Sequence, residues 1–144
     1  MQPKHFIAHL DRAAIESAIQ KAEHQTSGEI RVVIHRPPVA DAVAVARAEF
    51  VRLGMTKTRQ RNAVLLFVAP ASQSFALIGD EGVHAKCGDG FWSEVAAAMQ
   101  KDFRDGNHTG AIIEGIQRAG ALLAEHFPPE PGATDELPNQ VIEQ

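Results

Sequence analysis

Three segments that lie far apart in the sequence carry side chains suited to an ion-binding or hydrolytic site. Glu29 opens one apolar run, Arg61 and Asn62 precede a second, and Asp80 and Glu81 follow a third. Carboxylate oxygens bind hard divalent cations such as Ca²⁺ or Mg²⁺, and arginine pairs well with phosphate oxygens. The candidate metal ligands are therefore Glu29, Asp80 and Glu81. The candidate catalytic residues are Arg61, Asn62 and Asp80.

The apolar runs predict a small sheet that positions these side chains. The unbroken apolar run at 63–69 is typical of a strand buried on both faces. The short tip at 70–73 predicts a hairpin, so a strand at 74–79 should run antiparallel to the first. The β-branched run at 29–35 predicts another strand. A helix at about 41–53 would connect strands 29–35 and 63–69 as a right-handed parallel pair.

These strand directions bring the candidate residues to one edge of the sheet. Parallel strands begin at the same edge, and an antiparallel neighbour returns to it. We therefore expect the starts of the two parallel strands to meet the end of the hairpin strand. The residues that should lie close together are Glu29, Arg61, Asn62 and Asp80, with Lys57, Arg59 and His84 in reach of the same rim.

Two interpretations of this edge remain open. It could hold a divalent cation, with Arg61 meeting an anionic oxygen such as that of a phosphate group. It could also be a structural network of ion pairs that neutralises charge around the sheet. Ligands of open α/β sheets usually bind beyond the carboxyl ends of parallel strands, and this edge is the opposite one.

Helical periodicity completes the predicted fold. Apolar positions recur at helical spacing after Asp11, at about 41–53, at 91–104 and at 109–126. We expect Asp11 to cap the first of these helices, Val43 to lie on the buried face of the second, and Phe103 to be a core residue of the third. Helices layered on a mixed sheet predict an α/β protein, a three-layer α/β/α sandwich with a small mixed central sheet. We divide the chain into an N-terminal arm at residues 1–10, one domain at 11–127 and a tail at 128–144. The acidic, proline-rich composition of the tail predicts disorder.

Two further motifs allow a chemical and a structural interpretation. Residues 105–110 imitate the first half of a calcium loop, but Ile116 stands where that loop needs glutamate, so we expect a helix–helix link capped by Thr109. Cys87 follows His84 by three residues. A cysteine–histidine nucleophile would need these groups to meet in space, and a structural thiol is the alternative.

Composition excludes several classes of protein. The chain has 144 residues, a net charge of −4 and a single cysteine, which fits one domain in a reducing compartment. No window is apolar enough to span a bilayer, and the N-terminus lacks the apolar segment of a signal peptide. We expect a cytoplasmic protein without a membrane span. Nucleic-acid binding is disfavoured because the only basic patch is short and lacks aromatic residues.

Six short motifs occur in a fixed order along the chain: Ser27–Ile34, Arg61–Leu66, Ile78–His84, Phe91–Trp92, Phe103–Gly106 and Gly110–Ile116. In this order they resemble the motifs of the TPM domain family, and the chain resembles a short bacterial cytoplasmic form of it. The resemblance implies an α/β/α sandwich. By matching positions it also draws attention to Glu29, Arg61, Asn62 and Asp80. Ala63 departs from the family, which usually has glycine after the asparagine.

The resemblance implies two kinds of function. Plant thylakoid members are associated with acid-phosphatase activity and photosystem II repair, and an animal member is an auxiliary protein of an acetylcholine receptor. We expect a non-catalytic interaction or accessory domain with an unknown protein partner. The alternative is a hydrolase that uses a divalent cation, Ca²⁺ or Mg²⁺, to act on a phosphorylated substrate.

Overall fold

The chain folds into helices on both faces of a small mixed sheet. The computed structural model describes residues 6, 8–88, 90–129 and 140–144. The described helices are α2 (Arg12–Glu23), α3 (Ala42–Arg52), α4 (Glu81–Cys87), α5 (Gly90–Arg104) and α6 (His108–His126), with short 3₁₀ turns η1 (Met55–Lys57) and η2 (Pro70–Ser72). The strands are β1 (Glu29–Ile34), β2 (Ala63–Ala69), β3 (Ser74–Gly79) and β4 (Ile142–Glu143).

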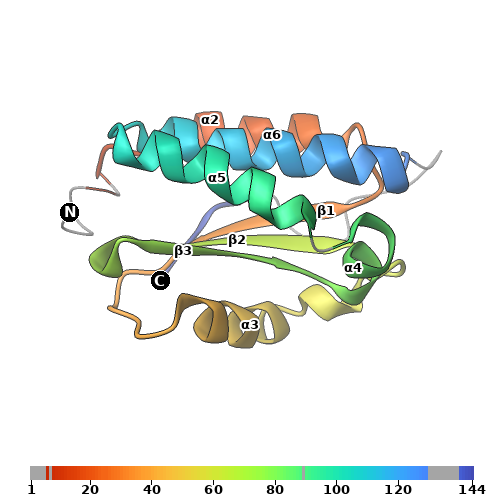
Figure 1. The fold of residues 1–144 in the computed structure, drawn as a ribbon, viewed down its shortest axis with the longest axis horizontal. Helices are drawn as coiled ribbons and strands as arrows, with labels where there is room; N and C mark the ends of the chain where they lie inside the picture. The colour runs from red at the N-terminus through yellow and green to blue at the C-terminus, as the bar shows by residue number, and fades with distance from the viewer. Residues whose placement is uncertain (1–5, 7, 89, 130–139) are drawn as a thin grey trace.

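These elements form three layers. Helices α2, α5 and α6 cover one face of the sheet and α3 covers the other, while α4 lies at one end (Figure 1). The three-layer α/β/α sandwich predicted from the sequence is confirmed. Among the described residues, no helix is both long and apolar enough to cross a membrane.

The sheet has the strand order β3-β2-β1-β4. Strands β1 and β2 are parallel with Glu29 opposite Ala63, and β2 and β3 are antiparallel with Val64 opposite Gly79. The predicted parallel pair and hairpin are therefore both present. This register places the starts of β1 and β2 and the end of β3 at one edge.

Strand β2 is buried along its whole length because both of its faces are covered. Val64, Leu66 and Val68 pack toward α2, α5 and α6. Leu65 and Phe67 belong to a second apolar core, which lies between the sheet and α3. Successive side chains of a strand point to opposite faces of the sheet, and here each face meets an apolar core. Every position must therefore be apolar, which is why the sequence of β2 has no polar residue at alternate positions.

Short polar residues start the helices, with two departures from expectation. Asp11 caps α2, as predicted, by accepting a hydrogen bond from the backbone of Ala14 at 3.0 Å. The cap of α6 is Asn107 and not Thr109, because the Asn107 side chain accepts from the backbone N–H of Gly110 at 3.0 Å. The Thr109 hydroxyl instead accepts from the backbone N–H of Asp11. In α3, Val43 was expected to be buried but is 45% exposed.

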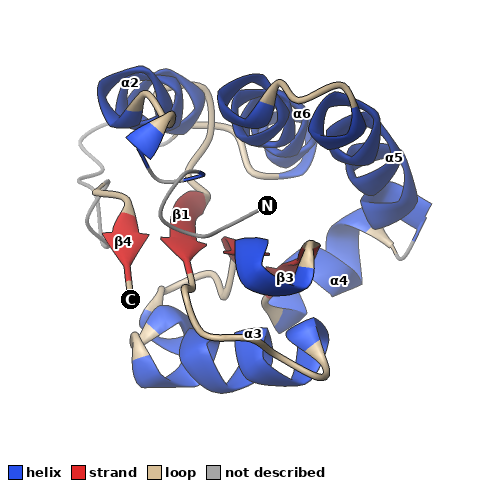
Figure 2. Ribbon diagram, turned by 90° about the vertical axis from the view of Figure 1, so that its left-hand side faces the viewer, coloured by secondary structure: helices blue, strands red, loops and turns tan. Residues whose placement is uncertain are grey.

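The expectation of a disordered tail is wrong for the last residues of the chain. Ile142 and Glu143 form β4, which pairs in parallel with β1 (Figure 2). Val141 is 3% exposed, and its backbone N–H and C=O are held by the side chains of Glu16 and Arg12. The predicted disorder at residues 130–139 concerns positions outside the described residues.

Candidate functional site

Arg61 and Asp80 form a bidentate ion pair where β2 begins and β3 ends. The Arg61 Nε lies 2.7 Å from Asp80 Oδ2, and its Nη2 lies 2.7 Å from Oδ1. Asp80 is only 5% exposed. Charge-assisted pairs with two parallel hydrogen bonds are among the strongest polar contacts in proteins. The hydrogen bonds to Asp80 raise the pKa of the Arg61 guanidinium, although partial desolvation acts against this.

The same aspartate also starts α4. Asp80 Oδ1 accepts a hydrogen bond from the backbone N–H of Glu81 at 2.8 Å. The next residue, Gly82, donates its backbone N–H to the carbonyl of Arg61 at 2.9 Å. A Cβ at Gly82 would lie 2.4 Å from the carbonyl oxygen of Gln60, so only glycine permits this approach. The start of α4 is thus hydrogen-bonded to the backbone just before β2, next to the ion pair.

Arg61 reaches its partner from an uncommon backbone conformation. Its φ angle is +53°, in the left-handed region that residues other than glycine seldom occupy. The conformation is held by contacts on both sides, since the Arg61 backbone N–H donates to the carbonyl of Thr58 and its carbonyl accepts from Gly82. The strain at Arg61 is therefore offset by hydrogen bonds that fix the direction of its side chain.

Asn62 joins the start of β1 to the start of β2. It is 1% exposed, and its backbone N–H donates to the Thr58 hydroxyl at 3.2 Å. Its side-chain NH₂ group donates to the Ser27 hydroxyl, and its backbone carbonyl accepts from the backbone N–H of Glu29. These hydrogen bonds of Asn62 join the segments before β1 and β2 to one another. Its position fits a residue that holds the sheet edge in shape.

The three predicted metal ligands, Glu29, Asp80 and Glu81, differ in burial and in their recorded contacts. Glu81 lies beside Arg61, with 3.2 Å between Oε1 and Nη1, but its side chain is 73% exposed. Glu29 is 3% exposed at the start of β1. Across residues 6, 8–88, 90–129 and 140–144, no three acidic, histidine or cysteine side chains are placed to hold a metal. Both Asp80 oxygens accept hydrogen bonds from Arg61, which offsets the negative charge of the carboxylate.

Cys87 has the wrong acidity for a nucleophile. Burial raises the pKa of the Cys87 thiol, the Glu125 carboxylate raises it further, and Lys86 lowers it by a smaller amount. A catalytic thiol needs the opposite shift, because the thiolate is the reactive form. The structural interpretation of Cys87 fits its environment better, since its side chain packs against the core.

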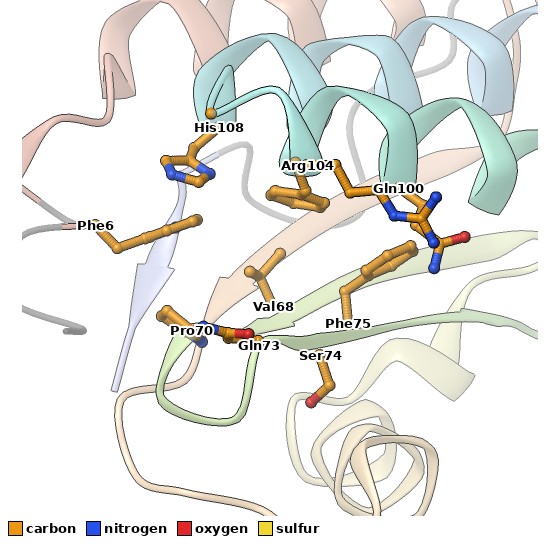
Figure 3. Close-up of a pocket in the computed structure, with 11 residues that line it drawn as sticks. Phe6, Val68, Pro70, Gln73, Ser74, Phe75, Gln100, Arg104 and His108 are labelled. Carbon is orange, nitrogen blue, oxygen red and sulfur yellow. The ribbon is translucent and has the colours of Figure 1, made fainter. Parts of the chain in front are cut away.

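A second candidate site, which the sequence did not reveal, lies at the other end of the sheet. A cavity of about 550 Å³ opens beside the hairpin tip, between the end of α5 and the start of α6 (Figure 3). Residues from distant segments line it, among them Phe6, Phe75, Gln100, Phe103, Arg104 and His108. This is the edge where the parallel strands end, which is the usual position for ligands of open α/β sheets.

The cavity wall is a cluster of rings. The ring of Phe6 lies 4.8 Å from that of His108, and the ring of Phe75 lies 5.4 Å from that of Phe103. Phe6 and Phe103 are 6.3 Å apart, which joins the two pairs. Burial lowers the pKa of His108, and nearby His9 lowers it further. Helical spacing had predicted Phe103 to be a core residue, and only the fold shows that it also borders a cavity.

The fold and these two edges define an α/β/α sandwich domain built on a parallel strand pair and an antiparallel hairpin. The model of the TPM domain family matches residues 1–122, so the chain belongs to that family. The NMR structure of the BA42 protein from the psychrophilic bacterium Bizionia argentinensis is similar, with 36% sequence identity and a TM-score of 0.88. The match covers 94% of this chain and 96% of that one.

A more distant solved structure shares the fold. The N-terminal domain of a protein from P. gingivalis is 19% identical, with a TM-score of 0.67 over 83% of this chain and 80% of that chain. No protein with a curated description matches this sequence. The family resemblance expected from the sequence motifs is thus confirmed.

Proposed function

We propose that this TPM domain is a non-catalytic interaction domain that serves a protein partner as an accessory. The observation that carries the proposal is the closed ion pair of Arg61 and Asp80. Both carboxylate oxygens accept from the guanidinium at 2.7 Å, and the carboxylate is nearly buried. A carboxylate whose two oxygens accept from one guanidinium and from the start of a helix is suited to a structural task.

The neighbouring residues support the same interpretation. Asn62 connects β1 to β2, Gly82 fixes α4 against the loop before β2, and Asp80 starts α4. Each candidate catalytic residue therefore has a role in holding the sheet edge. The proposal includes a location in the cytoplasm, where the single thiol of Cys87 would stay reduced.

The alternative function is phosphate-ester hydrolysis assisted by a divalent cation. Its support is that Arg61 and Glu81 are both partly open to solvent beside the buried Asp80. Such a site would need Asp80 to release Arg61 before it could bind a cation. The two functions therefore differ in whether Asp80 is needed for turnover or only for stability.

A hydrolysis assay separates them. The wild-type chain, Asp80→Asn and the control Lys101→Gln are incubated with p-nitrophenyl phosphate and either Mg²⁺ or Ca²⁺, at a temperature where circular dichroism shows all three folded. We expect none of them to release product faster than the solution without protein. Metal-dependent turnover by wild type and Lys101→Gln that is absent from folded Asp80→Asn would refute the interaction proposal.

A capture experiment tests the positive side of the proposal. The immobilised wild-type chain and Arg61→Gln are each exposed to extract of the cells that produce the protein. We expect both to retain the same protein in a fixed stoichiometric ratio, because a structural ion pair is not itself the contact surface. Retention of no protein in a fixed ratio by either chain would count against an accessory role.

A further inference from the structure

The cavity at the carboxyl ends of the parallel strands has the features of a binding site for a small amphipathic anion. We propose that it binds an aromatic carboxylate, with the ring against the aromatic wall and the carboxylate at Arg104. This inference does not depend on the proposed function, because the cavity and the Arg61–Asp80 pair lie at opposite ends of the sheet. Three separate observations support the proposal: the size and aromatic lining of the cavity, the charge of Arg104, and the lack of acidic residues in the described lining.

The first observation is the size and lining of the cavity. Its volume of about 550 Å³ lies within the range of roughly 300–1,000 Å³ that is usual for small-molecule sites. Phe75 projects into it from the start of β3, and Phe6 borders it from the N-terminal arm (Figure 3). A bound ring could pack against the faces and edges of these phenylalanine rings. Aromatic pairs contribute more than the area they bury, so the wall favours a ring over an alkyl chain.

The second observation is the positive charge of Arg104 beside the cavity. Arg104 ends α5 and is exposed, and no ion pair joins it to another residue in the described part of the chain. Its side chain and that of Gln100, one helical turn earlier, lie on the same side of the cavity as Phe75 (Figure 3). Guanidinium and carboxamide groups can both donate hydrogen bonds to one carboxylate.

The third observation is the absence of negative charge from the described lining of the cavity. The described lining residues include Arg104 and His108 but no aspartate or glutamate. The Nδ1 atom of His108 is buried and has no hydrogen-bond partner among the described residues. An anion therefore meets a positive charge and polar hydrogens, whereas an organic cation would meet Arg104. A single arginine suits a carboxylate better than a polyphosphate, which is usually held by several backbone and basic groups.

The test is an NMR titration of the full-length ¹⁵N-labelled chain with three ligands of the same shape. These are 3-phenylpropanoate, its neutral amide 3-phenylpropanamide, and the cation 3-phenylpropylamine. We expect saturable shifts for the carboxylate at Phe75, Gln100 and His108. The amide should bind about tenfold more weakly, because it loses the charge-assisted contact. The amine should cause no saturable shift.

Two variants show whether the charge at Arg104 is responsible. In Arg104→Gln the carboxylate and the amide should bind with equal affinity. In Lys101→Gln, which removes a cation from the same helix outside the cavity lining, the tenfold preference should remain. Hexanoate distinguishes an aromatic from an aliphatic anion, and it should bind more weakly than 3-phenylpropanoate.

Four outcomes would overturn the proposal. They are no saturable shift with 3-phenylpropanoate, equal affinities of acid and amide for the wild type, shifts centred outside the cavity, and a preference for hexanoate. Both variants change exposed side chains, so they are expected to fold. Spectra of the free variants that overlay on the wild type outside α5 establish this directly.

Discussion

Arg61 and Asp80, nineteen residues apart, face each other through two hydrogen bonds of 2.7 Å across the open end of a hairpin. The pair closes the β2–β3 hairpin at the end opposite its tip. It also positions α4, since Asp80 begins that helix. One ion pair thus fixes a strand start, a strand end and a helix start. The contribution of this ion pair to the free energy of unfolding can be measured by mutation.

Replacing Asp80 should destabilise the fold without abolishing it. Asp80→Ala removes the cap of α4 and a nearly buried acceptor, and we expect it to lower the free energy of unfolding by about 2 kcal/mol. Urea unfolding followed by circular dichroism measures this. Glu81→Gln is the control, because the Glu81 side chain is 73% exposed and its loss should have little effect.

A double-mutant cycle tests the coupling of the pair. In the Asp80→Ala background, Arg61→Gln should have less effect on stability than it has in the wild type, because its partner is already gone. Equal effects in the two backgrounds would mean that the bidentate contact contributes nothing measurable to folding.

Gly82 should tolerate no side chain. In Gly82→Ala the added Cβ would lie 2.4 Å from the carbonyl oxygen of Gln60 and 2.6 Å from that of Arg61, both of them backbone atoms. We expect a loss of about 2 kcal/mol in the free energy of unfolding, since backbone must move. Gly90→Ala is the matched control, because a Cβ there meets nothing within 4 Å. Similar melting temperatures for the two variants would refute the close approach.

The stability of the protein should depend on pH through His108. The pKa of His108 lies below its ordinary value of 6.5, because of burial and then because of His9. Between the folded pKa and 6.5 the unfolded chain binds more protons than the folded one, so stability falls as the pH decreases through this window. The contribution of His108 to the free energy of unfolding is therefore fully present above pH 6.5. His108→Phe should show a shallower decrease in melting temperature between neutral and acidic pH, and an unchanged slope would contradict the assignment.

The thiol of Cys87 should react slowly, and two charge variants should change its rate in opposite directions. Burial and Glu125 raise the pKa of Cys87, so little thiolate is present at neutral pH. Glu125→Gln should accelerate the reaction with an aromatic disulfide reagent, and Lys86→Gln should slow it. Rates are measured across a range of pH under native conditions. A wild-type rate above that of free cysteine at neutral pH would indicate an activated thiol after all.

The C-terminal residues should contribute to stability although they follow a proline-rich segment. Val141 is 3% exposed, and removing its two methyl groups in Val141→Ala should lower the free energy of unfolding by about 1.5 kcal/mol. Gln140→Ala is the control because Gln140 is exposed. Thermal unfolding of both variants provides the comparison, and no difference between them would mean that β4 is not docked in solution.

Some features of the site followed directly from the sequence. The apolar run at Ala63–Ala69 and the short tip after it predicted β2, the hairpin and β3 with the bounds that the structure has. The meeting of Arg61 and Asp80 followed from strand direction alone. That inference needed no side-chain detail, because residues flanking paired ends of a hairpin are necessarily neighbours.

Other features were out of reach because they depend on contacts between distant segments. The composition of the tail predicted disorder, yet β4 forms because β1 offers an open edge and the side chains of Arg12 and Glu16 hold Val141. The capping residue of α6 was misassigned to Thr109, because Asn107 and Thr109 are both capable caps and only the helix start decides between them.

The layered architecture and the edge where charges gather could be predicted from the sequence, because apolar periodicity and turn chemistry are local properties of the chain. The contacts at that edge became visible only in the folded chain. Arg61 pairs with both oxygens of Asp80, and a cavity opens at the other end of the sheet. Hydrogen-bond partners and cavities are set by side-chain positions across segments that packing alone brings together, and no local pattern encodes them.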